Sequence, residues 1–223
     1  MSPGQRALRE RFLQVDTTTV SDVLGLHGRL DQALATDLLP LAEGQSRLAG
    51  FAYTVRTAML PYQGPGDPDK MAAIEGMGEG VVSVWAGDAQ GVASFGELLA
   101  LGMKVRGCTG MVVNGGVRDR DGIVKAGIPV YAKYRSPVQS IGRLKVTGWQ
   151  VPVTMPGATS RHVTVTPGDF MLGDADGVVV VPAALAATVL EQAEAITARE
   201  RAIRGEVDSG ASLGVILGRY GRV

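Results

Sequence analysis

The stretch GMVVNGGVRDRDGIVKAGIPVYAK, residues 110–133, contains the alternation that decides the fold. GMVVN (110–114) predicts a short buried strand, because apolar residues dominate it. GIVKAG (122–127) predicts a brief helical turn, and IPVYAK (128–133) predicts a second strand. A strand, a short helix and another strand in succession indicate an α/β sheet.

The same alternation continues upstream. AGFAYTVRT (49–57) and EGVVSVWAG (79–87) predict two earlier strands. The segment PYQGPGDPDK (61–70) lies between them and predicts a loop, since it contains three prolines and two glycines. Residues 94–107 predict an amphipathic helix, and residues 17–28 predict another near the N-terminus.

Downstream the pattern changes to strands without helices between them. Four segments predict short strands separated by turns: 149–155, 161–166, 169–173 and 177–182. Residues 182–204 predict the longest helix, which fits docking on a neighbouring copy and packing on its own sheet equally well. The whole chain, 1–223, therefore predicts one α/β domain with a mixed central sheet and a second layer of strands.

Composition excludes several classes of protein. The 22 basic and 22 acidic residues cancel, so no global field draws the chain to nucleic acid or to a membrane. The single cysteine, Cys108, excludes an intramolecular disulfide, and we expect it to be a buried structural thiol. No apolar run reaches the roughly 18 residues of a membrane span, and the N-terminus lacks a secretory pattern, so we expect a cytoplasmic protein.

Familiar catalytic and metal motifs are missing from the sequence. His27 and His162 are 135 positions apart, which does not indicate a metal pair. Zinc spacings, a Walker A loop and GxSxG do not occur. The glycine-containing stretch at 87–96 lacks the GxGxxG spacing of a dinucleotide loop.

SFGE, at 94–97, is the first candidate site. Ser94 and Glu97 have the spacing of a capping box, which is a complete structural explanation. The same helix start also offers free backbone amides and a positive dipole end, and Gly96 lets a ligand approach closely. A carboxylate bound to the amides of residues 96–99, Gly96, Glu97, Leu98 and Leu99, is the functional alternative.

NGGVRD, at 114–119, is the second candidate site. We expect Gly115 and Gly116 to let the chain turn sharply after the strand. Arg118 offers a planar fork suited to a carboxylate or an enolate oxygen, and Asp119 is a hard oxygen ligand suited to Mg²⁺ or Mn²⁺. A salt-bridged surface turn is the structural alternative.

The two candidates are separated by one helix–strand unit. In a sheet such loops lie at neighbouring strand ends, so they can face one pocket.

Six motifs now occur in a characteristic order: GD at 87–88, FGELLA at 95–100, GMVVNGGVRD at 110–119, IPVYAK at 128–133, TPGD at 166–169 and DADGVVVVP at 174–182. In this series the chain resembles the HMG aldolase family, the 4-hydroxy-4-methyl-2-oxoglutarate and 4-carboxy-4-hydroxy-2-oxoadipate aldolases. That family shares a superfamily with the ribonuclease E activity regulator A (RraA-like) proteins. The resemblance runs from about Asp22 to Pro182, and its most specific part is the RD after a Gly-rich strand end with GELLA upstream.

The resemblance implies an RraA-like αββα sandwich that assembles as a homotrimer or a dimer of trimers, with active sites between subunits. It implies a divalent Mg²⁺ or Mn²⁺ bound directly by Asp119, with Arg118 on the pyruvyl oxygen. It further implies that the amides of residues 96–99 hold the pyruvyl carboxylate and that Glu97 orders water at the cation.

A glutamate from a neighbour's C-terminal helix would complete the implied site, and Glu191, Glu194 and Glu200 are the candidates. One departure concerns Asn114, where many family members carry aspartate. If that aspartate only orders a turn, little changes; if it tunes the waters at the cation, activity or metal preference shifts.

The function that the resemblance implies is a class II pyruvate aldolase, a lyase. It would cleave a 4-hydroxy-2-oxo dicarboxylic acid to pyruvate through an enolate, with oxaloacetate decarboxylation as a side activity. The alternative is a non-catalytic RraA-like regulator that binds a ribonuclease or a helicase. Substrate choice would depend on whatever contacts the far carboxylate, for which the loop at 61–70 and Arg120 are the candidates.

Overall fold

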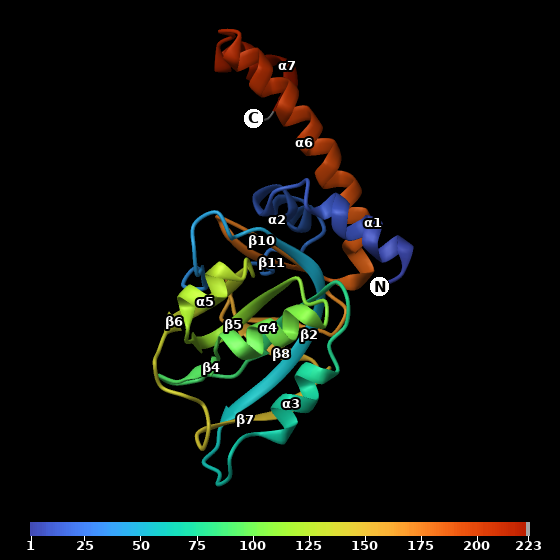
Figure 1. Cartoon of the computed structure of the whole chain (residues 1–223). Coiled ribbons are helices and arrows are strands. Elements are labelled where there is room, and N and C mark those ends of the chain that lie inside the picture. Colours follow the sequence, from blue (N-terminus) through green and yellow to red (C-terminus); the bar gives the residue numbers. More distant parts are fainter. Residues whose placement is uncertain (222–223) are drawn as a thin grey trace.

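A mixed sheet forms the centre of the computed structural model, which describes residues 1–221 (Figure 1). Within that range it has nine strands: β1 (Leu39–Pro40), β2 (Leu48–Met59), β3 (Val81–Ala86), β4 (Ala93–Phe95), β5 (Gly110–Val117), β6 (Val130–Arg135), β7 (Leu144–Trp149), β10 (Phe170–Asp174) and β11 (Gly177–Val181). Their order is β1-β6-β5-β3-β2-β10-β11, with β4 paired to β5 and β7 paired to β2. The neighbours β2, β3, β5 and β6 run parallel, and β10, β11, β7 and β1 pair antiparallel.

The parallel strands are covered on both faces, which explains their nearly continuous apolar sequences. Helices α3 (Pro68–Glu75), α4 (Glu97–Val105) and α5 (Arg120–Lys125) contribute to the core on one face, together with Met111 and Val113 of β5. A two-stranded sheet of β8 (Val153–Pro156) and β9 (His162–Val165) contributes to the core on the other face, together with Val112. The predicted α/β class with a mixed sheet and a second layer of strands is confirmed.

The predicted strand 149–155 does not form as one element, because β7 ends at Trp149 and β8 begins at Val153, and α3 begins at Pro68 inside the predicted loop 61–70. Two predictions close to the candidate site were also wrong. Ser94 does not start a helix: it lies buried in β4, and α4 begins at Glu97 with Gly96 as its cap residue. Gly115 and Gly116 do not form a turn, because β5 continues through them while β4 and β6 pair on its two sides. Gly116 is small for a packing reason: a Cβ there would lie 2.3 Å from a ring carbon of Tyr134.

The terminal helices form a third cluster against β10 and β11. Helices α1 (Pro3–Phe12), α2 (Thr17–Leu26) and α6 (Ala186–Asp208) share it, and a 3-10 turn (Ala183–Leu185) leads into α6. The first half of α6 is buried at Val189, Leu190 and Ala193, whereas the second half projects from the body and carries α7 (Leu213–Tyr220) (Figure 1). The expectation that this helix packs on its own domain therefore holds for its first half. The second half extends away from the domain.

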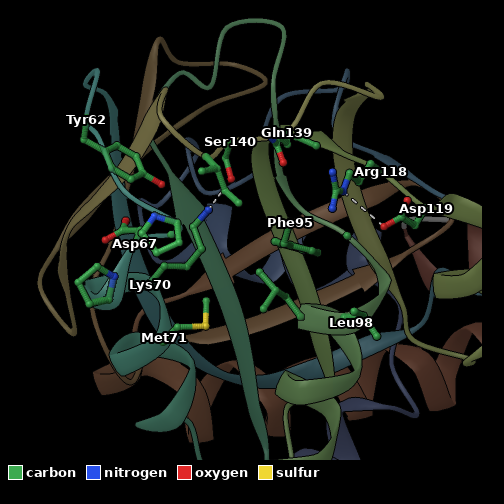
Figure 2. Close-up of a pocket in the computed structure, with 17 residues that line it drawn as sticks. Tyr62, Asp67, Lys70, Met71, Phe95, Leu98, Arg118, Asp119, Gln139 and Ser140 are labelled. Atoms are coloured by element: carbon green, nitrogen blue, oxygen red, sulfur yellow. Dashed lines mark hydrogen bonds and ion pairs between the residues drawn. The ribbon is translucent and has the colours of Figure 1, made fainter.

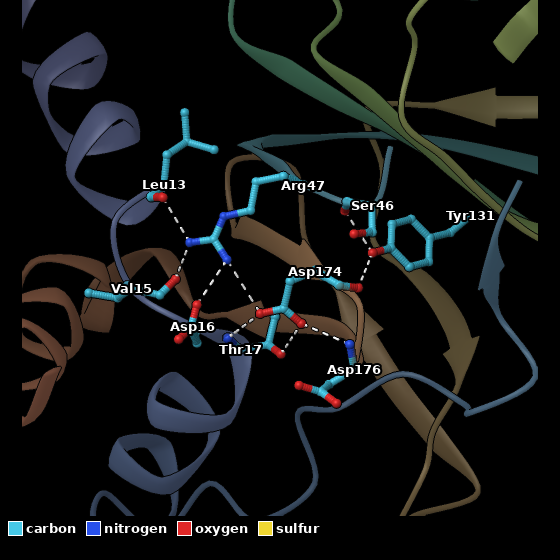
Figure 3. Close-up of polar contacts among 9 residues, drawn as sticks. All are labelled: Leu13, Val15, Asp16, Thr17, Ser46, Arg47, Tyr131, Asp174 and Asp176. Carbon is cyan, nitrogen blue, oxygen red and sulfur yellow. Dashed lines mark hydrogen bonds and ion pairs between the residues drawn. The ribbon is translucent and has the colours of Figure 1, made fainter. Parts of the chain in front are cut away.

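A charged cluster joins the α1–α2 connection to the β10–β11 hairpin (Figure 3). Asp174 accepts hydrogen bonds from the Thr17 amide at 2.8 Å and the Thr17 hydroxyl at 2.6 Å, and pairs with Arg47 at 3.4 Å. Arg47 also donates to the backbone oxygens of Leu13 and Val15. Asp174 thus supplies the first turn of α2 with an acceptor from a distant part of the chain.

Two further expectations concern the single cysteine and membrane-spanning helices. Cys108 is buried, and its burial raises the thiol pKa, as expected for a structural cysteine. Within residues 1–221, the helices are too short or too polar to cross a bilayer.

Candidate functional site

A cavity of about 750 Å³ lies where α3, β4, the start of α4 and the end of β5 meet (Figure 2). The segment 139–141 closes one side of it. Both candidate motifs reach this cavity: Gly96, Leu98, Leu99, Arg118 and Asp119 all line it. The prediction that the two loops face one pocket is confirmed.

Parallel pairing of β4 with β5 brings the two loops together. Phe95 is in register with Val117, and the Arg118 amide donates to the Phe95 oxygen at 3.1 Å. The residues that follow each strand, Gly96 and Arg118–Asp119, therefore emerge side by side. This is the neighbouring-strand-end arrangement in which α/β sheets commonly bind ligands.

Asp119 joins the two motifs directly. Its Oδ2 accepts a hydrogen bond from the Glu97 amide at 3.3 Å, so a carboxylate from the next loop, not Ser94, provides an acceptor for the start of α4. The same oxygen lies 3.5 Å from Arg118 Nε. The salt-bridged turn that we considered as the structural alternative is thus present, yet Arg118 and Asp119 remain 42% and 48% exposed and line the cavity.

Local backbone geometry fixes the position of this carboxylate. Asp119 has φ 56°, in the left-handed region, which aspartate tolerates better than most residues. Gly96 makes the close approach of the two loops feasible, because a Cβ there would lie 2.2 Å from Asp119 Oδ2 and 2.9 Å from Arg118 Cγ.

Glu97 and Leu98 differ in position: Leu98 lines the cavity, whereas Glu97, a predicted site residue, does not. The Glu97 carboxylate lies over Gly122, where a Cβ would come within 2.2 Å of Oε2. Leu98 is 81% exposed at the mouth of the cavity.

Lys70 is a cavity residue that the sequence alone did not single out. It is only 4% exposed, and its Nζ donates to the Ser94 oxygen at 2.9 Å and to Ser140 Oγ at 2.8 Å (Figure 2). Desolvation by burial lowers the pKa of Lys70 to about 8, although the nearby Asp67 acts in the opposite direction. Its sequence signal was weak: it is the last residue of the loop that we proposed for the far carboxylate.

Asp67 holds the backbone around Lys70 in place. One carboxylate oxygen accepts from the Asp69 amide at 3.1 Å and caps α3, and the other accepts from the Val146 amide of β7 at 2.7 Å. Asp67 is buried with both oxygens engaged, so we assign it to the architecture of the site.

The other candidates lie elsewhere. Arg120 donates to the Leu41 oxygen at 3.0 Å and pairs with Asp121, and it does not line the cavity. Glu191, Glu194 and Glu200 stand on α6, which packs on α1 and α2, and none of the three lines the cavity of its own chain. Glu194 already holds Arg11, with two hydrogen bonds of 2.8 and 2.6 Å.

Asn114 belongs to β5, and its side-chain oxygen is buried without a hydrogen-bond partner in the structure. A carboxylate at this place would bury a charge in the same surroundings, which is the costlier state. The amide is therefore less costly at this position than a carboxylate would be.

The oxygen ligands beside Asp119 can be compared with those that a hard divalent cation requires. The carboxylate is half-exposed and lines the cavity, and the absence of a side chain at Gly96 lets it approach the start of α4. Within residues 1–221, His, Cys, Asp and Glu side chains form no group of three or more that could hold a metal. One chain thus offers a single carboxylate, a set compatible with Mg²⁺, which keeps several waters and takes ligands from its substrate.

Comparison with known proteins agrees with the fold and the motifs. The family model for RraA-like proteins (aldolase/RraA) matches residues 17–180. An uncharacterised protein of Methanocaldococcus jannaschii is 31% identical over 80% of this chain and 81% of its own length. A protein of Halalkalibacterium halodurans, provisionally named 4-hydroxy-4-methyl-2-oxoglutarate aldolase, is 29% identical over 93% of each chain.

A solved structure from Streptomyces coelicolor superimposes with a TM-score of 0.78 at 25% identity, over 90% of this chain and 98% of that one. It is described as an unusual member of the RNase ES inhibitor RraA family. The match of the family model covers most of the chain and includes both loops of the cavity. The chain is therefore a member of the RraA-like family (aldolase/RraA).

Proposed function

We propose that this protein is a divalent-metal-dependent aldolase. It cleaves a 4-hydroxy-2-oxo dicarboxylic acid, such as 4-hydroxy-4-methyl-2-oxoglutarate, to pyruvate and a second oxo acid, with oxaloacetate decarboxylation as a side activity. The observation that carries the proposal is the convergence of Arg118, Asp119 and the first turn of α4 on one cavity. The provisional aldolase name of the Halalkalibacterium halodurans relative supports it.

Each group has a role that its chemistry suits. The first-turn amides of α4 bind the pyruvyl carboxylate, because helix N-termini favour anions. The Arg118 guanidinium donates to the C2 oxygen, where negative charge develops during the reaction. Asp119 would hold Mg²⁺ or Mn²⁺, which would supply Lewis-acid stabilisation of the negative charge that develops at the pyruvyl end.

The reaction balances without a further co-substrate. The 4-hydroxyl loses its proton to water that Glu97 orders, the C3–C4 bond breaks, and its electron pair forms the enolate of pyruvate. Protonation at C3 then gives pyruvate, and the former C4 fragment leaves as an oxo acid. Loss of CO₂ from oxaloacetate produces the same enolate, which accounts for the side activity.

The proposal includes an assembly of three subunits or a dimer of trimers. None of the three candidate glutamates of α6 lines the cavity of its own chain, so a role at the site requires a neighbouring copy. Because Glu194 is engaged by Arg11, Glu191 and Glu200 are the stronger candidates. Sedimentation equilibrium tests the assembly, and a monomer at micromolar concentration contradicts it.

Pyruvate release, coupled to lactate dehydrogenase, tests the activity. The wild type should convert oxaloacetate and 4-hydroxy-4-methyl-2-oxoglutarate only with Mg²⁺ or Mn²⁺, and a chelator should stop both reactions. Asp119→Asn keeps the size of the side chain but loses its charge, and it should lower turnover by at least about 100-fold, since a charged interaction at a reacting centre contributes several kcal/mol. Turnover that survives both the chelator and this substitution refutes the site.

The rival function is a regulator that binds a ribonuclease or a helicase. The likeness to the structure described as belonging to the RNase ES inhibitor RraA family favours it. If pyruvate release is absent with every divalent metal while the purified protein lowers the activity of a ribonuclease E-type enzyme, the regulator replaces the aldolase.

A further inference from the structure

The cavity contains a buried cation that the proposed chemistry at Arg118 and Asp119 does not use. Lys70 is 4% exposed, and both acceptors of its ammonium, the Ser94 oxygen and Ser140 Oγ, are neutral. Within residues 1–221, no carboxylate lies within the 4.0 Å of an ion pair from Lys70. Asp67 acts to raise the pKa of Lys70, but both of its carboxylate oxygens already accept backbone amides.

Such a lysine is physically unusual. Lysine is almost never fully buried unless paired, because desolvating an ammonium costs far more than neutral hydrogen bonds return. An ammonium has three donors, and two of those of Lys70 are engaged by Ser94 and Ser140. The third donor and the uncompensated charge are available to an anionic group that enters the cavity.

Lys70 and Arg118 occupy different parts of the same cavity. Figure 2 shows them on the two sides of Phe95, with Leu98 and Met71 along the wall below. The space thus has a cationic group at each side and an apolar middle. This arrangement matches a short acid that carries a carboxylate at each end of an aliphatic chain.

We propose that Lys70 is the specificity-determining cation of the cavity and binds the second carboxylate of a dicarboxylic 2-oxo acid. Arg118 and the first turn of α4 hold the opposite, pyruvyl end. The proposed function decides which end of the acid reacts, and to that extent the proposal rests on it. The binding of the two carboxylates does not depend on the proposed function. It selects Lys70 over Arg120, whose guanidinium is bound to Leu41 and Asp121 outside the cavity.

A purely structural role is the rival explanation. Lys70 links α3 to β4 and to the segment around Ser140, so it also helps to shape the cavity. A role in shape alone affects every ligand equally. A role in recognition affects only ligands that carry the second carboxylate.

Two unreactive ligands of the same length separate the two roles. 2-Oxoglutarate and 2-oxopentanoate differ only in a carboxylate or a methyl group at C5, and neither has a 4-hydroxyl to cleave. Titration calorimetry with Mg²⁺ present measures their binding to the full-length protein. The wild type should prefer 2-oxoglutarate by about 10- to 100-fold, the range of one charge-assisted hydrogen bond.

Lys70→Met keeps most of the side-chain volume without the charge. It should abolish the preference by weakening 2-oxoglutarate alone, while 2-oxopentanoate changes less than about threefold. The matched control is Lys104→Met, which removes another lysine that donates to a backbone carbonyl, that of Ala126, outside the cavity. It should leave both affinities unchanged.

Three results overturn the proposal: a wild type without preference, a wild type that binds neither ligand, or a Lys70→Met variant that loses both ligands equally. If Lys70→Met does not fold, the wild-type preference alone decides. Because neither ligand is turned over, the proposed aldolase activity is tested separately. If the protein prefers 2-oxoglutarate but releases no pyruvate from any substrate, Lys70 is still a dicarboxylate-binding group. The proposed aldolase activity is then wrong.

Discussion

Asp119 performs two tasks with one carboxylate. Its Oδ2 accepts the Glu97 amide at the start of α4, and the same group faces the cavity beside Arg118. The Glu97 amide at the start of α4 and the Arg118 guanidinium both lie beside this carboxylate. The carboxylate that we propose as the metal ligand is therefore held in place by the protein itself, and its left-handed backbone is the local strain that accompanies this position.

Lys70 gives a pH-dependent prediction for stability. Its pKa is about 8 in the folded chain and 10.5 ordinarily. Below pH 8 both states are protonated and the folded state bears the cost of a buried ammonium. Between pH 8 and 10.5 the unfolded state binds more protons, so the unfolding free energy rises with pH.

The rise should be visible in the difference between the wild type and Lys70→Met. Over pH 8 to 10.5 that difference should shift in favour of the wild type by on the order of 3 kcal/mol, since each pKa unit corresponds to about 1.4 kcal/mol. Urea unfolding at several pH values measures it, and the variant cancels the titration of all other groups. A difference that stays constant with pH shows that Lys70 has an ordinary pKa.

In two helices the first backbone amide donates a hydrogen bond to a carboxylate from a distant part of the chain. Asp174 accepts the first amide of α2, and Asp119 accepts the first amide of α4. At α4 this arrangement fastens the helix start to the end of β5, so the amides and the charged pair cannot move independently. The geometry of the cavity is thus a property of the connected elements α4 and β5.

Gly96→Ala tests this connection at the level of the element. Gly96 has φ −128° and ψ −164°, which alanine adopts freely, so the effect is steric: the new Cβ would meet Asp119 Oδ2 and Arg118 Cγ. Pyruvate release should fall by at least about 100-fold with the fold retained, because small displacements at a reacting centre are costly.

Gly102→Ala is the matched control on the same helix. A Cβ at Gly102 meets nothing within 4 Å, so this substitution should stabilise the protein by about 0.5–1 kcal/mol and leave turnover unchanged. Steady-state kinetics and thermal unfolding of both variants provide the measurement. Wild-type turnover in Gly96→Ala contradicts the proposed closeness of the two loops.

The sequence predicted those elements whose signal is local. The β-branched runs of β3, β5 and β6 and the loops after them indicated the sheet and its shared cavity. The short β4 escaped prediction because it depends on pairing with β5, and the cap of α4 comes from 22 residues away. For β7, the alternation of Leu144 and Val146 with Lys145 and Thr147 was a usable signal that we did not apply.

At the scale of the whole molecule, the cavity and the C-terminal arm lie in different regions. The cavity is bounded by α3, α4 and β5, whereas the second half of α6 and α7 extend away from the body (Figure 1). On α7, Leu213, Val215 and Leu217 are about half exposed, which is consistent with an arm that contacts another copy. Of the candidate glutamates, only Glu200 lies on the projecting half of α6, and the proposed assembly would use this arm to bring it to a neighbour's cavity.

A crystal soaked with Mn²⁺ and pyruvate tests the central claim most directly. The account predicts an anomalous peak within direct ligand distance of the Asp119 carboxylate. It also predicts pyruvate between Arg118 and the amides of residues 96–99, with an α6 glutamate of a neighbouring copy beside them. Manganese bound away from Asp119, or pyruvate in a region that Arg118 and α4 do not reach, contradicts the account.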